Sequence, residues 1–115
     1  NSALYAIPNA LRLRGPVDLP TLERSLAEIV RRHELLRARF ATERGRPVQQ
    51  IAPAAPLALD VRDLRALPDP EPAALQQASA EAQRPFDLAA GTLLRATLLR
   101  LADDDQILLL TLHHI

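Results

Sequence analysis

The sequence predicts an α+β fold in which two helices alternate with strands and hairpins. Apolar residues alternate with polar ones in several short runs, recur at helical spacing in two longer segments, and fill an almost uninterrupted run near the C-terminus. With 115 residues the chain is one domain or part of one, and it is long enough to bury a core. The order strand, helix, hairpin, strand, helix, hairpin is typical of layered helices and sheets.

The first predicted elements are a strand and a helix. Apolar residues alternate from Leu4 to Leu13, around a break at Pro8 and Asn9. Asp18 is a plausible helix cap, and the helix that follows has an apolar stripe at helical spacing. The stripe consists of Leu19, Leu22, Leu26, Ile29, Val30 and His33. The position of His33 on this stripe predicts a packed, hydrogen-bonded histidine.

The middle of the chain predicts a hairpin over residues 36–51, a strand from Leu57 to Leu64, and a second helix from Glu71 to Arg84. The hairpin turns at residues 43–46. The second helix is rich in alanine, glutamine and glutamate and has a thin apolar stripe. That stripe consists of Leu75, Ala78 and Ala82.

The last predicted element is a hairpin from Leu93 to Leu101 and from Ile107 to His114, with an acidic turn between the strands. From Ile107 to Leu112 every residue except Thr111 is a large aliphatic, which predicts a central strand with two buried faces. Neighbouring side chains of a strand point to opposite faces. His113 and His114 therefore do not form one site, and on this stretch alone structural histidines are the simpler interpretation.

Composition excludes several classes of function. Fourteen basic and fourteen acidic residues give a net charge of zero, so no global field favours nucleic acid or an anionic membrane. The absence of cysteine excludes disulfides, a thiolate nucleophile and a cysteine zinc site. The consecutive aspartates at 103–105 are more typical of a solvated turn than of a metal site, and we expect no metal.

No signal peptide is visible, and we expect an intracellular, cytoplasmic protein. Because the chain opens inside a predicted strand and stops on an apolar residue, we also expect a fragment.

Five segments, in this order along the chain, together resemble the N-terminal half of a condensation domain of nonribosomal peptide synthetases. They are Tyr5-Ala6-Ile7-Pro8, Leu13 to Asp18, Arg32 to Phe40, Pro85 to Leu88 with Leu93 to Arg95, and His113-His114-Ile115. The third is similar to the family motif Arg-His-Glu-x-Leu-Arg, and the fifth is similar to the start of its active-site motif His-His-x-x-x-Asp-Gly. The chain ends before the Asp-Gly of that motif.

The resemblance implies a fold like that of chloramphenicol acetyltransferase, a two-layer sandwich of which residues 1–115 would be the N-terminal subdomain only. It implies amide bond formation between an acyl or peptidyl thioester on an upstream carrier domain and the amine of an aminoacyl group on a downstream carrier domain. The partners are those peptidyl carrier domains and the adenylation domain of the same module. No cofactor is expected to bind directly, since the phosphopantetheine arms belong to the carriers.

The resemblance also implies roles for four residues. His114 is expected to be the catalytic histidine that faces the tunnel between the two halves, while His113 points back into its own half. Arg32 or Arg37 is expected to support the active-site motif by pairing with its aspartate, and the sequence does not choose between them.

Related activities stay open. An epimerization domain, a related acyltransferase and a non-catalytic docking module of the same fold all remain as alternatives. Heterocyclization domains do not fit, because their motif has aspartates in place of the two histidines.

Overall fold

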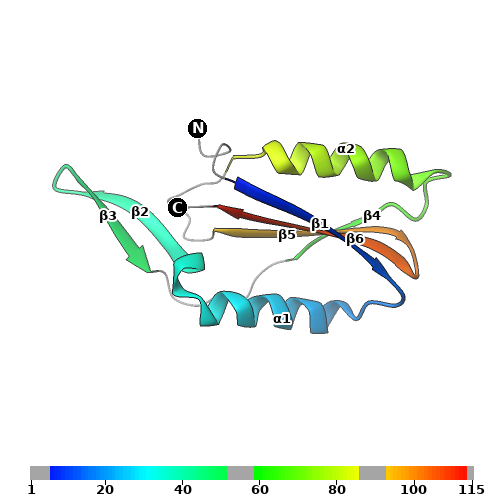
Figure 1. Cartoon of the computed structure of the whole chain (residues 1–115), viewed down its shortest axis with the longest axis horizontal. Coiled ribbons are helices and arrows are strands. Elements are labelled where there is room, and N and C mark those ends of the chain that lie inside the picture. The colour runs from blue at the N-terminus through cyan, green and yellow to red at the C-terminus, as the bar shows by residue number, and fades with distance from the viewer. Residues whose placement is uncertain (1–5, 52–58, 86–92, 114–115) are drawn as a thin grey trace.

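A four-stranded sheet forms the centre of the computed structural model, which describes residues 6–51, 59–85 and 93–113, without the side chains of residues 6–8, 35, 39–40 and 113. The strand order is β1-β6-β5-β4 (Figure 1). The strands span Ala6–Arg14 (β1), Asp105–His113 (β6), Leu94–Ala102 (β5) and Asp60–Asp63 (β4). β6 pairs antiparallel with both β1 and β5, and β4 pairs parallel with β5. The apolar C-terminal strand is therefore interior to the sheet, as predicted.

The strand β1 is continuous, so the predicted break at Pro8 and Asn9 was wrong. Pro8 is paired with Thr111 and Asn9 with Leu110 in an unbroken register with β6. β1 is an edge strand in the described sheet. A proline is tolerated there because its missing N–H group can lie on the unpaired side of the strand.

Two helices cover the sheet from opposite sides (Figure 1). The helix α1 spans Leu19–Arg32 and α2 spans Pro70–Gln83. α2 packs on one face of the sheet and contributes Ala74 to a cluster of buried apolar side chains there. The cluster consists of Leu64, Ala74, Leu99, Leu101, Ile107 and Leu109. The predicted α+β layered fold is confirmed, and the structure adds that the helices lie on opposite faces.

The helical stripes differ in detail from those predicted. In α1 the buried residues are Leu26 and Val30, whereas Ile29 is exposed. In α2 the buried residues are Ala74 and Glu81, and the predicted stripe residue Leu75 is 66% exposed. Of the predicted stripe, Ala78 packs against the buried cluster and Ala82 is half-buried, so only Leu75 was wrong. Small alanines occur on several faces of this helix and give its apolar pattern little contrast.

A hairpin extends from the end of α1 and forms a separate two-stranded sheet (Figure 1). One turn of 3₁₀ helix, η2 (Glu34–Arg37), leads from α1 into β2 (Ala38–Glu43), which pairs antiparallel with β3 (Arg46–Ile51). Arg44 and Gly45 both have positive φ angles, 52° and 77°, as tight hairpin turns of the primed types require. The predicted hairpin and its turn are confirmed.

The predicted strand 57–64 is observed only as the four-residue strand β4, because residues 59 and 64 are not in a strand and Leu57 lies outside the described residues. Both α-helices of the described residues have 14 residues, and neither is long and apolar enough to span a membrane.

Candidate functional site

The end of β6 carries the sequence that resembles the active-site motif. His113 is the last residue of β6, and its backbone is paired with Ala6 of β1. On the other side of β6 the register with β5 runs to the pair Leu112 and Leu94. His114 and the side chain of His113 lie outside the described residues. The strand therefore leads to the proposed catalytic histidine along a backbone that is paired on both sides up to Leu112.

The segment that resembles the motif Arg-His-Glu-x-Leu-Arg lies at the same end of the sheet. The backbone N–H of Leu93 donates a hydrogen bond to the carbonyl oxygen of Leu36 in η2, at 3.0 Å. The next residue, Leu94, is paired with Leu112. One hydrogen bond thus connects η2 to the start of β5, beside the end of β6, although the two motifs are more than seventy residues apart in the sequence.

Arg32 faces solvent on the last turn of α1. Its side chain is 68% exposed, and its Nε donates to the carboxylate of Glu28 at 2.8 Å. Arg31 pairs with the same carboxylate. The hydrogen bonds from these two arginines lower the pKa of Glu28 to about 2. Arg32 is therefore engaged in a surface ion pair within its own helix.

Arg37 points back toward the end of α1 and is partly buried. Its guanidinium donates to the carbonyl oxygens of Val30, at 3.3 Å, and Arg31, at 3.4 Å. These carbonyls lie in the last turn of the helix, where backbone oxygens lack intrahelical donors. Arg37 therefore fixes η2 against α1, next to the hydrogen bond between Leu36 and Leu93.

His33 was predicted to be packed and hydrogen-bonded, and this prediction was wrong. The residue is exposed and caps the end of α1, where its backbone N–H donates to the carbonyl of Ile29 at 3.2 Å. The helix ends one residue before the predicted stripe does. The imidazole is therefore beyond the buried face.

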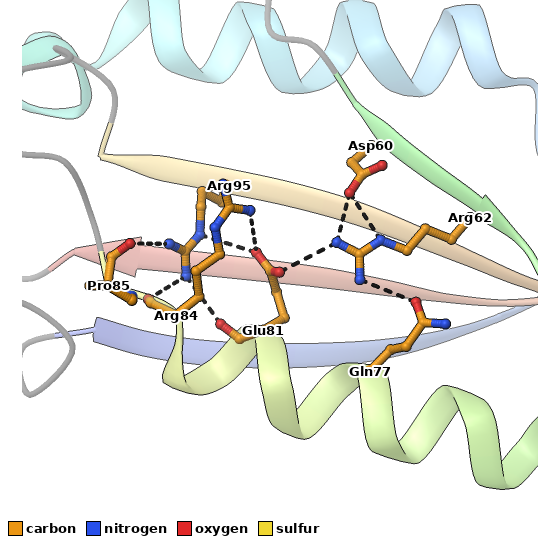
Figure 2. Close-up of polar contacts among 7 residues, drawn as sticks. All are labelled: Asp60, Arg62, Gln77, Glu81, Arg84, Pro85 and Arg95. Carbon is orange, nitrogen blue, oxygen red and sulfur yellow. Dashed lines mark hydrogen bonds and ion pairs between the residues drawn. The ribbon is translucent and has the colours of Figure 1, made fainter.

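A buried ion-pair cluster, which was not predicted from the sequence, connects α2 to the sheet (Figure 2). The carboxylate of Glu81 in α2 is 6% exposed and lies 3.1 Å from Nε of Arg95 in β5. Arg62 of β4 approaches the same carboxylate to 3.6 Å, and Arg84 at the end of α2 approaches it to 3.5 Å. The only sequence signal for this cluster is one glutamate at a core-facing position of α2, which alone does not identify its partners.

Arg95 also binds the backbone that leaves α2. Its two terminal nitrogens donate to the carbonyl oxygens of Glu81, Arg84 and Pro85 at 2.9 to 3.1 Å (Figure 2). Burial lowers the pKa of the Arg95 guanidinium, and the neighbouring Glu81 charge opposes this shift. Arg95 is therefore surrounded by oxygen acceptors from one helix end.

The chain matches a known family over its whole length. The family model described as "Condensation domain" matches residues 1–115. The chain belongs to the condensation domain family. The resemblance to condensation domains that the sequence motifs indicated is thereby confirmed.

Curated relatives of this condensation domain chain are large peptide synthetases. It is 49% identical to a linear gramicidin synthase of Brevibacillus parabrevis and 45% identical to phosphinothricin tripeptide synthetase PhsC of Streptomyces viridochromogenes. The matches cover 100% and 96% of this chain but only 2% and 10% of those relatives. The chain is thus similar to a small part of each.

Solved condensation domains have the same fold. The first condensation domain of the CDA synthetase superposes with a TM-score of 0.84 at 28% identity, over 99% of this chain and 29% of that one. The starter condensation domain of rhizomide synthetase superposes with a TM-score of 0.85 at 27% identity, over 98% of this chain and 27% of that one. The chloramphenicol acetyltransferase-like fold expected from the resemblance is consistent with these superpositions.

A small pocket of about 280 Å³ lies on the α2 side of the sheet in this condensation domain chain. It is lined by Asn9, Ala10, Ala78, Ser79, Glu81, Ala82, Leu109 and Thr111. The space exists because most of the α2 side chains that line it are small, and Glu81 is its charged lining residue. The pocket is therefore next to the ion-pair cluster and near the end of β6.

The acidic turn is occupied by ion pairs at the opposite end of the sheet. Asp103 accepts from Arg65 at 2.7 Å, and Asp105 accepts from Arg12 at 2.5 Å. The hydrogen bond from Arg12 lowers the pKa of Asp105. These two carboxylates thus have cationic partners from β1 and from the loop after β4.

Proposed function

We propose that residues 1–115 are the N-terminal part of a condensation domain that joins two carrier-bound substrates through an amide bond. The observation that supports this best is the meeting of two motifs at one end of the sheet. β6 leads to His113 and His114, and the bond between Leu93 and Leu36 brings the segment from Arg32 to Arg37 to the same place. Both motifs contribute to the active site in the family that this chain resembles.

The proposed reaction is attack of an amine on a thioester. The amine of the downstream aminoacyl group forms a C–N bond with the thioester carbon of the upstream acyl group, and the C–S bond breaks to release the carrier thiol. The amine gives up one proton, which His114 accepts as the tetrahedral intermediate forms and returns to the departing sulfur. The thioesters are carried on the phosphopantetheine arms of the two carrier domains, and an adenylation domain of the same module supplies the aminoacyl group.

Magnitudes limit what His114 has to contribute. An α-amino group titrates near about 8, so reaching its neutral form at pH 7 costs only about 1.4 kcal/mol. A general base contributes roughly 10²- to 10⁴-fold, whereas holding both reactants in line contributes up to about 7 to 11 kcal/mol. The main task of His114 is therefore to orient the amine and to remove its proton as the tetrahedral intermediate forms.

We further propose that Arg37, and not Arg32, supports the active-site motif. Arg32 is exposed and paired with Glu28, whereas Arg37 is partly buried at the end of η2, next to the residue that accepts the hydrogen bond from the start of β5. An arginine fork in such a position suits the carboxylate of the family motif.

The test of the function is the substitution His114→Ala in the complete domain. With donor-loaded and acceptor-loaded carrier proteins, the variant should form the amide product at least about 10²-fold more slowly than the parent, as loss of a general base predicts. Product is measured by mass spectrometry after release from the acceptor carrier. The matched control is His33→Ala, because that histidine is exposed at the end of α1. Product formation at the parent rate by His114→Ala would refute the role of His114. If the parent domain itself formed no product, a docking module would be favoured.

A further inference from the structure

The contribution to stability alone does not explain well why the buried cluster around Glu81 consists of charged residues. Glu81 is nearly inaccessible to solvent, and Arg95 is 15% exposed. Burying two opposite charges costs desolvation that their attraction often does not recover, and apolar replacements of similar volume are often neutral or stabilising. A pair of this kind is better suited to holding elements in one fixed arrangement.

Arg95 connects three structural features at one end of the sheet. Its guanidinium holds the last carbonyls of α2 and that of Pro85. Its backbone is paired with Thr111 of β6, two residues before His113. Leu93, two residues before it, donates to the carbonyl of Leu36 in η2.

The contacts of Arg95 lie where β5 supports the end of β6. The register between β5 and β6 ends at Leu94 and Leu112, and Arg95 is the next residue of β5 after that last pair. Thr111 is buried, and it lines the pocket beside Glu81. A shift of β5 relative to α2 would therefore move the end of β6 directly.

We propose that Arg95 and Glu81 are positioning residues for the condensation reaction, which act by fixing the end of β6 that carries His113 and His114. This inference rests on the proposed function, since it assumes that the histidine acts in catalysis. Arg95 acts through the backbone of β5, and Glu81 fixes its guanidinium from α2. Neither side chain is required to touch substrate.

The experiment uses the complete domain with three variants of the pair and one control. Arg95→Met removes the charge and the fork, Arg95→Lys keeps the charge only, and Glu81→Gln removes the opposite charge at nearly the same shape. The control is Arg65→Met, because Arg65 also pairs with two carboxylates, those of Asp63 and Asp103, but lies at the opposite end of the sheet.

We expect kcat for amide formation to fall about 10- to 100-fold in Arg95→Met, since small misplacements of reacting groups have effects of this size. KM for the loaded carriers should change less than about twofold, because carrier binding is not the affected step. Arg95→Lys should be intermediate, and Arg65→Met should retain the parent kcat. Amide hydrogen exchange should accelerate at residues 111–112 and stay unchanged at residues 107–109.

The outcomes separate a positioning role from a structural one. If kcat of Arg95→Met fell only in proportion to its folded fraction, measured by circular dichroism, the proposal would be overturned. If Arg95→Met did not fold, Glu81→Gln would decide: a lower kcat at unchanged KM supports the proposal, and an unchanged kcat overturns it. A parent domain without amide formation would instead remove the proposed function, so the two failures are distinguishable.

Discussion

Arginines make the specific polar contacts around the candidate site, and they differ in the oxygen atoms that they bind. Arg32 binds a side-chain carboxylate on the surface of its own helix, whereas Arg37 binds backbone oxygens at the helix end. Exposed ion pairs contribute little to stability, at most about 1 kcal/mol. A partly buried guanidinium with fixed acceptors is more constrained, and this difference allows the two motif arginines to be tested separately.

Arg37→Met in the complete domain should lower the rate of amide formation at least about tenfold, equivalent to about 1.4 kcal/mol of activation free energy. The substitution removes both the donor to Val30 and Arg31 and the charge proposed to face the motif carboxylate. The rate is divided by the concentration of folded protein, and the loaded carriers are in excess.

The matched control for this prediction is Arg32→Met, which removes an arginine from the same motif but breaks only the exposed pair with Glu28. It should keep the rate within about twofold of the parent, as expected for a surface substitution. A larger loss in Arg32→Met than in Arg37→Met would mean that Arg32, and not Arg37, is the supporting arginine.

At the scale of elements, hydrophobic periodicity was enough to place both α-helices and the four strands of the sheet, whereas the 3₁₀ turn η2 was not predicted. The aliphatic run from Ile107 to Leu112 predicted an interior strand, and β6 is interior. Periodicity failed where it has little contrast. In α2 the predicted stripe placed Ala78 correctly on the buried side but wrongly included Leu75, and the glutamate that faces the sheet could not be recognised without its partners.

The ion-pair cluster could not be predicted from the sequence for a physical reason. Arg62, Glu81 and Arg95 come from three elements, and they meet only because β4 pairs parallel with β5 while α2 crosses the same face. Each residue alone has the character of an ordinary surface charge. The histidine pair and the arginine motif, in contrast, were found because they are contiguous in the sequence.

The exposure of Leu75 gives a prediction at the scale of elements. Leu99 is fully buried in the cluster under α2, whereas Leu75 of α2 is exposed. Leu99→Ala in the complete domain should lower the free energy of unfolding by about 2 to 5 kcal/mol, because it removes buried methyl groups and leaves a cavity.

Leu75→Ala is the control, and it should change the free energy of unfolding by less than about 0.5 kcal/mol. Both values are measured by urea denaturation followed by circular dichroism. A cost for Leu75→Ala as large as that for Leu99→Ala would mean that Leu75 packs against the sheet, as the apolar pattern predicted.

At the scale of the whole molecule, the chain is more extended than a compact domain of its length. Its radius of gyration is 15.7 Å, with principal extents of 55 × 28 × 17 Å. The scaling law for compact domains gives about 13 Å for 115 residues. The hairpin of β2 and β3 projects from the sheet and accounts for the long axis (Figure 1). The solved condensation domains that this chain matches are more than three times longer.

This shape leads to a prediction about the 115-residue chain by itself. The fold that the family resemblance implies places the reaction in a tunnel between two halves, and this chain corresponds to about a quarter to a third of the solved domains. With one wall missing, the amine and the thioester are not held in line, and the positioning contribution of up to about 7 to 11 kcal/mol is lost. The isolated chain should therefore form no amide product with loaded carriers, under conditions in which the complete domain does.

The assay is mass spectrometry of the acceptor carrier, with circular dichroism as a check that the chain is folded. Turnover by the folded chain alone would show that the described sheet and helices form a sufficient active site, and the two-half model would then be wrong.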